Sequence, residues 1–136
     1  MVSSHFSRIL LTYKGKILLT FTENNPNALQ NVLWHFIGGV KQKDKSEEET
    51  ITKLVEKETS IKLVSIEFLS SQGFDNSTEH FYSAKLTDEN VNNMERAEGQ
   101  IINFFTLSEI EKLPLSISTQ LFISKHKDLL ENMRNS

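Results

Sequence analysis

Residues that could bind a phosphorylated ligand gather between positions 34 and 63 of the chain. Gly38 and Gly39 follow a short apolar run, and paired glycines let the backbone turn sharply and expose its amides or carbonyls to a ligand. The loop after them is rich in lysine, which can attract phosphate, although such a loop is more often simply solvated. Further along, Lys57 directly precedes Glu58. A lysine side chain can pair with an anion, or with a neighbouring carboxylate such as Glu58.

A helix is needed to hold Lys57 and Glu58. Ser46 stands three residues before Glu49, the spacing at which each side chain satisfies a free backbone N–H at a helix start. We therefore predict a helix from about Glu47 to Thr59, and the three glutamates of its first turn are explained by the positive end of the helix dipole. Apolar residues at i, i+3 and i+4 form one stripe that faces a core: Ile51, Leu54 and Val55.

This stretch resembles the Nudix box, the motif G-x5-E-x7-R-E-U-x-E-E-x-G-U of the Nudix hydrolase family, in which U is an aliphatic residue. Four positions match: Gly39 the opening glycine, Val55 and Ile61 the aliphatic residues, and Glu58 the last glutamate. The other signature positions differ: Lys45, Leu54 and Lys57 replace glutamates, Lys53 replaces the arginine and Ser60 the closing glycine. The resemblance is therefore to a degenerate box.

Members of this family hydrolyse a diphosphate linked to another group, typically in nucleoside diphosphate derivatives, with water as the nucleophile and Mg²⁺ neutralising charge. Mg²⁺ requires hard oxygen ligands in a nearly octahedral arrangement. Positions 54, 57 and 58 share one helix face because they lie at i, i+3 and i+4, yet here they are leucine, lysine and glutamate. Loss of even an outer partner of a metal costs roughly 10- to 100-fold in affinity or activity. We therefore expect a weak Mg²⁺ site, if any, and weak or absent hydrolysis.

The leading hypothesis is a Nudix-like protein that has lost efficient hydrolysis and retains a nucleotide- or diphosphate-binding role. The residues expected to contact the ligand are Gly38, Gly39, Lys53, Lys57, Trp34 and His35. The first alternative is an active pyrophosphohydrolase that uses Glu58 and Glu98 as catalytic and metal-binding residues. Glu98 best matches a carboxylate that the family often supplies before its last strand, and Glu95 is the second choice. Another alternative is an interaction module that neither binds nor hydrolyses a nucleotide.

The composition is that of one globular domain spanning residues 1–136, with 38% hydrophobic and 24% charged residues. A net charge of −3 argues against general nucleic-acid binding, which relies on clustered lysine and arginine. The chain has no cysteine, which excludes disulfides and thiolate metal sites, and no apolar run reaches the roughly 20 residues of a membrane span. These features favour a cytoplasmic protein, and the resemblance adds a homodimer as an option.

Periodicity and turn residues outline the remaining elements. Strands are predicted at 6–13, 16–22, 34–37, 61–70, 80–86 and 101–106, and helices at 108–112 and from 116 onwards. A hairpin turn is predicted at Lys14-Gly15, and loops at 23–27, 72–78 and 87–98, the last of these with at most a short helix. The four histidines show no pair at metal-ligand spacing, so we expect structural or surface roles for His5, His35, His80 and His126. Together with the resemblance, these elements give an α/β (α+β) class with a curved mixed sheet between helices.

Overall fold

The structure, a computed structural model, describes residues 4–22, 33–41, 43–74 and 76–133. The loop predicted at 23–27 lies outside the described residues. Within the described ranges, no helix is both long enough and apolar enough to cross a membrane.

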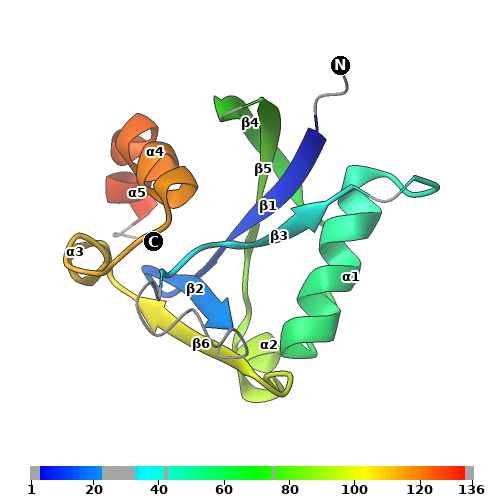
Figure 1. Ribbon diagram of the computed structural model, residues 1–136. Coiled ribbons are helices and arrows are strands. Elements are labelled where there is room, and N and C mark those ends of the chain that lie inside the picture. The colour runs from blue at the N-terminus through cyan, green and yellow to red at the C-terminus, as the bar shows by residue number, and fades with distance from the viewer. Residues whose placement is uncertain (1–3, 23–32, 42, 75, 134–136) are drawn as a thin grey trace.

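A six-stranded mixed sheet forms the middle of the molecule (Figure 1). Its strands are β1 (Ser4–Tyr13), β2 (Lys16–Thr22), β3 (Ile37–Val40), β4 (Glu67–Phe74), β5 (Ser77–Lys85) and β6 (Gln100–Phe105). They lie in the order β4-β5-β1-β2-β6, and β3 pairs with β1 as well. β1 is parallel to β5, whereas the other pairs in this sheet are antiparallel. β1 is therefore the central strand.

Two strands, β2 and β3, pair with the same edge of β1. β3 pairs with residues Phe6 to Ile9, and β2 pairs with Thr12 and Tyr13 further along. β5 occupies the opposite edge over most of the length of β1. The sheet consequently divides beyond β1, and β3 leads the chain towards the first helix (Figure 1).

Helices lie on both faces of the sheet (Figure 1). They are α1 (Glu47–Thr59), α2 (Asp88–Asn92), α3 (Leu107–Ile110), α4 (Ile117–Lys125) and α5 (Lys127–Met133). Side chains alternate along β1, so that Ile9 and Leu11 pack with Ile51 of α1, while Leu10 packs with Phe122 of α4. The predicted class, a mixed sheet between helices, is confirmed.

The helix predicted over residues 47–59 is confirmed at both ends. Ser46 Oγ accepts a hydrogen bond from the Glu49 amide at 3.1 Å, and a Glu49 carboxylate oxygen accepts one from the Ser46 amide at 3.3 Å. Ser60 ends the helix in the left-handed conformation with φ of 65°, which glycine adopts most easily. The hairpin turn is also confirmed, with φ of 48° at Lys14 and 77° at Gly15.

The turn predicted at Gly38 and Gly39 is wrong. Both glycines lie within β3, while Trp34 and His35, predicted as strand, form only isolated bridges. A Cβ atom at Gly38 would stand 2.3 Å from the carbonyl oxygen of Ser7 on β1. Glycine is therefore needed there for the close approach of two strands rather than for a turn.

The strand predicted at 61–70 begins later, since residues 61–66 are irregular and β4 starts at Glu67. Ile61 is buried in the core beneath α1, so its apolar character reflects burial without strand pairing. Much of the loop predicted at 72–78 is also strand. Gln72 is a buried residue of β4 that donates hydrogen bonds to Glu79 and to the backbone carbonyl of Ser118. The prediction placed it in a loop because neither partner can be identified from the neighbouring sequence.

The C-terminal helices begin and end differently from the prediction. The helix predicted at 108–112 is α3, which Thr106 caps two residues earlier than expected. The tail forms two helices instead of one, because the backbone leaves the helical region at His126. The His126 ring stacks on Phe122 at 4.2 Å between centroids, and its Nε2 lies 3.0 Å from Ser70 Oγ of β4. These contacts hold the break against the sheet.

Candidate functional site

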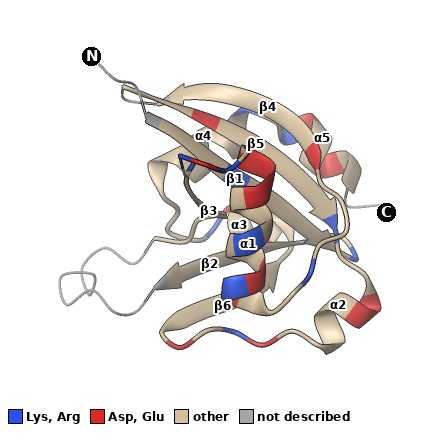
Figure 2. Cartoon of the chain, turned by 90° about the vertical axis from the view of Figure 1, so that its right-hand side faces the viewer, with Lys and Arg blue, Asp and Glu red and all other residues tan. Residues whose placement is uncertain are grey.

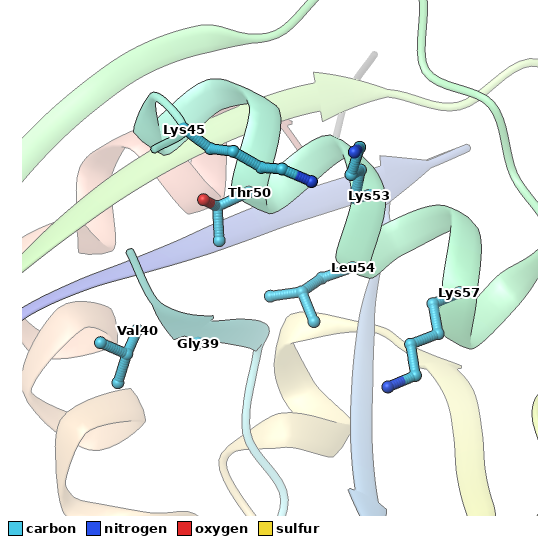
Figure 3. A pocket seen from close by; sticks show the side chains of 7 residues that line it. All are labelled: Gly39, Val40, Lys45, Thr50, Lys53, Leu54 and Lys57. Atoms are coloured by element: carbon cyan, nitrogen blue, oxygen red, sulfur yellow. The ribbon is translucent and has the colours of Figure 1, made fainter. Parts of the chain in front are cut away.

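A cavity of about 210 Å³ lies between α1 and β3 (Figure 3). The helix contributes residues at i, i+3, i+4 and i+7, which share one face: Thr50, Lys53, Leu54 and Lys57. β3 and the loop that follows it add Gly39, Val40 and Lys45. These seven residues are called the lysine cavity below. It contains three of the residues predicted to contact a ligand, Gly39, Lys53 and Lys57.

Gly39 of β3 and Leu54 of α1 lie in close contact. A Cβ atom on Gly39 would stand 3.0 Å from Leu54 Cδ1, so an alanine there would require this methyl group to shift by a few tenths of an ångström. Leu54 is half-buried and packs against the core that α1 shares with the sheet. The prediction that Leu54 is a core residue is therefore confirmed in part. Its side chain also forms part of the cavity wall.

The lysine cavity concentrates positive charge. Lys45, Lys53 and Lys57 line it, and none of the seven lining residues is acidic. The Lys45 side chain runs above Thr50 towards Lys53 (Figure 3), and contact between the two amines lowers the pKa of Lys45. Three of the acids of α1, Glu47 to Glu49, lie in its first turn, whereas Lys53 and Lys57 lie further along the helix (Figure 2). The cavity is therefore better suited to an anion than to a cation.

Glu58, the glutamate retained from the box, does not line the lysine cavity. One of its carboxylate oxygens accepts a hydrogen bond from Gln100 Nε2 of β6 at 3.1 Å. Burial raises the pKa of Glu58, and the neighbouring Lys57 only partly opposes this. The side chain is half-buried, so the carboxylate binds a proton more readily than an exposed one.

The loop before β6 lies against the C-terminal end of α1. The amide of Ala97 donates to the carbonyl of Glu58 at 3.0 Å, and the amide of Glu95 donates to the carbonyl of Thr59 at 2.9 Å. Glu98 is exposed, in a separate hollow lined by residues 96–101. The backbone of the predicted loop thus reaches Glu58, while the side chain hydrogen-bonded to the Glu58 carboxylate comes from Gln100.

The donors around the lysine cavity do not fit Mg²⁺. A small hard cation requires several carboxylate, carbonyl or water oxygens. The lining side chains offer one hydroxyl, that of Thr50, among three ammonium groups, which repel a divalent cation. Glu58 supplies a single carboxylate nearby, already hydrogen-bonded to Gln100. The side chains that line the cavity therefore do not form an adequate ligand set for Mg²⁺.

Trp34 and His35 are not among the residues that line the lysine cavity. The Trp34 ring makes edge contacts with Phe21 and Phe105, at centroid distances of 4.6 and 4.8 Å, and packs on the core beneath α3 and α4. His35 Nδ1 lies 2.9 Å from the carbonyl oxygen of Phe36, and burial lowers the pKa of its imidazole. A ligand-binding role for Trp34 and His35 stays a prediction.

Sequence reasoning did not include Lys45 and Thr50 among the ligand-binding residues. Helical spacing was a sufficient signal for Thr50, which lies three residues before Lys53 and four before Leu54. Lys45 was recognised as a replacement for a glutamate, but it precedes the helix, and only the path of the loop places it beside Lys53.

Comparisons of sequence and of structure give different results. No family model matches the sequence, and no curated protein matches it. Solved structures do match. A MutT structure from work on Aliivibrio salmonicida and Vibrio cholerae has a TM-score of 0.72, at 14% identity over 98% of both chains. The Nudix domain of Shewanella oneidensis NrtR, in complex with ADP ribose, has a TM-score of 0.71, at 18% identity over 96% of this chain and 90% of that one.

A third similar structure is a MutT Nudix hydrolase from Burkholderia pseudomallei, with a TM-score of 0.73, at 17% identity over 91% of this chain and 98% of that one. At such identities the likeness concerns the arrangement of helices and strands rather than the chemistry of a site. The resemblance that the box indicates is confirmed at this level, and the protein therefore has the Nudix fold.

Proposed function

We propose that this Nudix-fold protein binds a diphosphate-containing ligand, such as a nucleoside diphosphate derivative, in the lysine cavity, and that it hydrolyses this ligand weakly or not at all. The observation that carries the proposal is the wall of the cavity, with three lysines and no acid. Lys45 and Lys57 occupy positions where the Nudix box has glutamates, so the charge changes sign at two places where the family uses carboxylates.

A diphosphate suits this wall by its charge and by its acceptor atoms. Each ammonium group can donate three hydrogen bonds, and those to phosphate oxygens are charge-assisted. A bound anion also relieves the repulsion between Lys45 and Lys53 that lowers the pKa of Lys45. The lysines would thus neutralise the ligand without a metal ion. ADP ribose in the similar Shewanella domain supports this class of ligand and provides a probe.

The test is isothermal titration calorimetry with ADP-ribose and ADP, with and without Mg²⁺, on wild type and on a Lys45→Gln/Lys53→Gln/Lys57→Gln variant. We expect binding without Mg²⁺. At about 0.5 to 1 kcal/mol for each exposed ion pair, loss of the three lysines should weaken binding by roughly 10- to 100-fold. Lys43→Gln controls for loss of a lysine outside the cavity, because Lys43 is exposed in the same loop as Lys45 and does not line the cavity. Binding that requires Mg²⁺ would contradict the proposal.

An active pyrophosphohydrolase is the second candidate, and one observation favours it. Burial raises the pKa of Glu58, as is common for a general base at an active site. Mg²⁺-dependent release of phosphate from a panel of nucleoside diphosphate derivatives, at ordinary enzymatic rates and abolished in Glu58→Gln, would establish this candidate. If neither binding nor turnover is detected, the remaining candidate function is that of an interaction module.

A further inference from the structure

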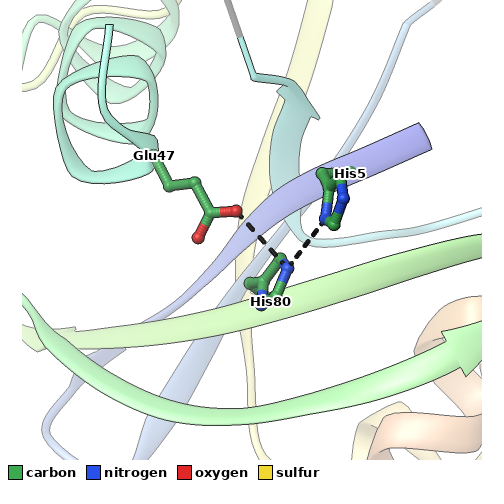
Figure 4. Close-up of side chains that lie close together, drawn as sticks. All are labelled: His5, Glu47 and His80. Carbon is green, nitrogen blue, oxygen red and sulfur yellow. Dashed lines mark hydrogen bonds and ion pairs between the residues drawn. The ribbon is translucent and has the colours of Figure 1, made fainter. Parts of the chain in front are cut away.

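A second cluster of polar side chains lies at the N-terminal end of α1 (Figure 4). It brings together His5 of β1, Glu47 of α1 and His80 of β5. His5 Nδ1 lies 3.2 Å from His80 Nε2, and the same His80 nitrogen lies 3.4 Å from Glu47 Oε2. None of the three residues lines the lysine cavity. Among the described residues this is the group of three carboxylate or imidazole ligands that comes within reach of one ion.

The register of the sheet explains why the two histidines meet. Ser7 of β1 is the partner of His80 on the parallel strand β5, and His5 lies two residues before Ser7. Side chains alternate along a strand, so His5 and Ser7 point to the same face. That face is the one covered by α1, whose first turn supplies Glu47. Three elements that are distant in the sequence therefore converge on one point.

Two of the three distances between ligand atoms in the cluster match those of a metal site. In a tetrahedral zinc site the metal–nitrogen bonds are about 2.0 to 2.1 Å, which places two ligand atoms about 3.3 to 3.4 Å apart. The two separations, 3.2 and 3.4 Å, lie close to this value, and all three ligand atoms lie within 4.8 Å of one another. Only a modest movement of the exposed His5 side chain would be needed for all three atoms to reach one ion.

The far atoms of two of these ligands have partners that hold them in place. His80 Nδ1 lies 2.9 Å from Ser71 Oγ on β4, and a proton on Nδ1 leaves Nε2 with the free electron pair that a metal requires. The Tyr82 hydroxyl donates to Glu47 Oε1 at 2.8 Å, which leaves Oε2 for an ion. Outer partners of this kind are typical of metal ligands.

We propose that His5, Glu47 and His80 bind a divalent transition-metal ion, with Zn²⁺ the best match. Two imidazole nitrogens and one carboxylate oxygen form a zinc ligand set, whereas Mg²⁺ and Ca²⁺ prefer oxygen alone. His5 is exposed, and the His80 and Glu47 side chains are 20% and 19% exposed, so an ion can enter from solvent. Bound metal would fasten the first turn of α1 to β1 and β5. The proposal is independent of the ligand of the lysine cavity.

The test uses the whole chain without a histidine tag, freed of metal with a chelator, and titrated with ZnCl₂ by calorimetry. We expect one Zn²⁺ per chain, a higher melting temperature with Zn²⁺, and no competition from Mg²⁺. Co²⁺ is a second probe, since its visible spectrum reports tetrahedral nitrogen and oxygen ligands. His5→Ala, Glu47→Gln and His80→Gln should each weaken binding by more than about 100-fold, and Tyr82→Phe by about 10- to 100-fold, because outer partners contribute less than ligands.

Glu48→Gln is the matched control, since Glu48 is exposed and adjacent to Glu47 and its replacement changes the net charge equally. It should bind Zn²⁺ like wild type. His5→Ala removes an exposed side chain near the start of β1, so its fold should be retained and its result can be interpreted alone. Failure of wild type to bind Zn²⁺, or full-strength binding in any of the three ligand variants, would overturn the three-ligand site.

Discussion

The two faces of the central sheet use charged side chains in opposite ways. On the face covered by α4, Arg8 Nε and Glu79 Oε2 form an ion pair of 2.6 Å, and the Glu79 side chain is 1% exposed. Ser118 and Gln72 donate further hydrogen bonds to the same carboxylate. On the face covered by α1, the lysine cavity has three cations and no acid among its lining residues. Charge that is matched inside the protein stabilises the fold, whereas unmatched charge around a cavity is available to a ligand.

The matched and the unmatched charges also differ in the direction of their pKa shifts. Burial by itself would raise the pKa of Glu79, but hydrogen bonds from Arg8, Ser118 and Gln72 bring it below its usual value. Around the lysine cavity, by contrast, like charges meet, and the pKa of Lys45 falls because Lys53 is beside it. The first arrangement is complete without a ligand, and the second improves when an anion binds.

The largest effect on this comparison is expected from Glu79→Gln. Removing one partner of a fully buried ion pair costs about 3 to 5 kcal/mol, and the partial exposure of Arg8 places the expected cost at the lower end of this range. The free energy of unfolding, measured with urea, should fall by this amount. Glu67→Gln, at an exposed position of β4, is the control and should change the free energy by less than about 0.5 kcal/mol. Equal stability of the two variants would show that the buried pair does not stabilise the fold.

Unfolding free energies measured across a range of pH test whether the pKa of Glu79 is lowered in the folded protein. Because the folded-state pKa of Glu79 is lowered, its stabilisation is present above the unfolded-state value of about 4.3 and is lost as pH falls through the folded-state pKa. The difference in unfolding free energy between wild type and Glu79→Gln should therefore shrink in acid. A difference that stays constant down to strongly acidic pH would contradict this assignment.

The second prediction concerns the face covered by α1, where Leu54→Glu and Lys57→Glu would be combined in one variant. The two glutamates would join Glu58 at i, i+3 and i+4 and convert a cationic wall into a carboxylate ligand set for Mg²⁺. We expect Mg²⁺-dependent hydrolysis of ADP-ribose to rise by about 10- to 100-fold over wild type, measured as phosphate or nucleotide release, while Mg²⁺-independent binding weakens. Lys62→Glu, at an exposed position, controls for the reversal of charge at Lys57. If the double variant folds but shows no Mg²⁺-dependent hydrolysis, the cavity does not hold the substrate.

The smallest expected effect is the uptake of protons by Lys45 when the ligand binds. A phosphate beside Lys45 favours its charged form, so the bound protein holds more protons than the free protein, and affinity falls as pH rises through the lowered pKa of Lys45. Calorimetry at alkaline pH in two buffers of different ionisation enthalpy should show uptake of less than one proton per ligand. Lys53→Gln removes the neighbour that lowers the pKa and should abolish the uptake. Uptake that persists in Lys53→Gln would assign it to another group.

The predictable part of the site follows from short-range rules. The spacing of Ser46 and Glu49 correctly predicted where α1 begins, and helical periodicity placed Lys53 and Lys57 on a common side. The position of Gly38 within β3 was not predicted, because paired glycines are as typical of turns as of close strand contacts, and only the approach of Ser7 distinguishes the two cases. Gln72 was assigned to a loop for a similar reason, since its buried partners lie elsewhere in the chain.

Capping and periodicity are sufficient to predict α1, its capping box and the positive face formed by its lysines, because both act within one or two helical turns. The sequence also identifies Glu58 as the glutamate of the box that remains. Two contacts appear only when the chain is folded: Glu58 meets Gln100, and His5 meets His80 although they are 75 residues apart. Those contacts depend on strand register and on the docking of α1 against the sheet, which arise from packing between distant segments and have no local signal.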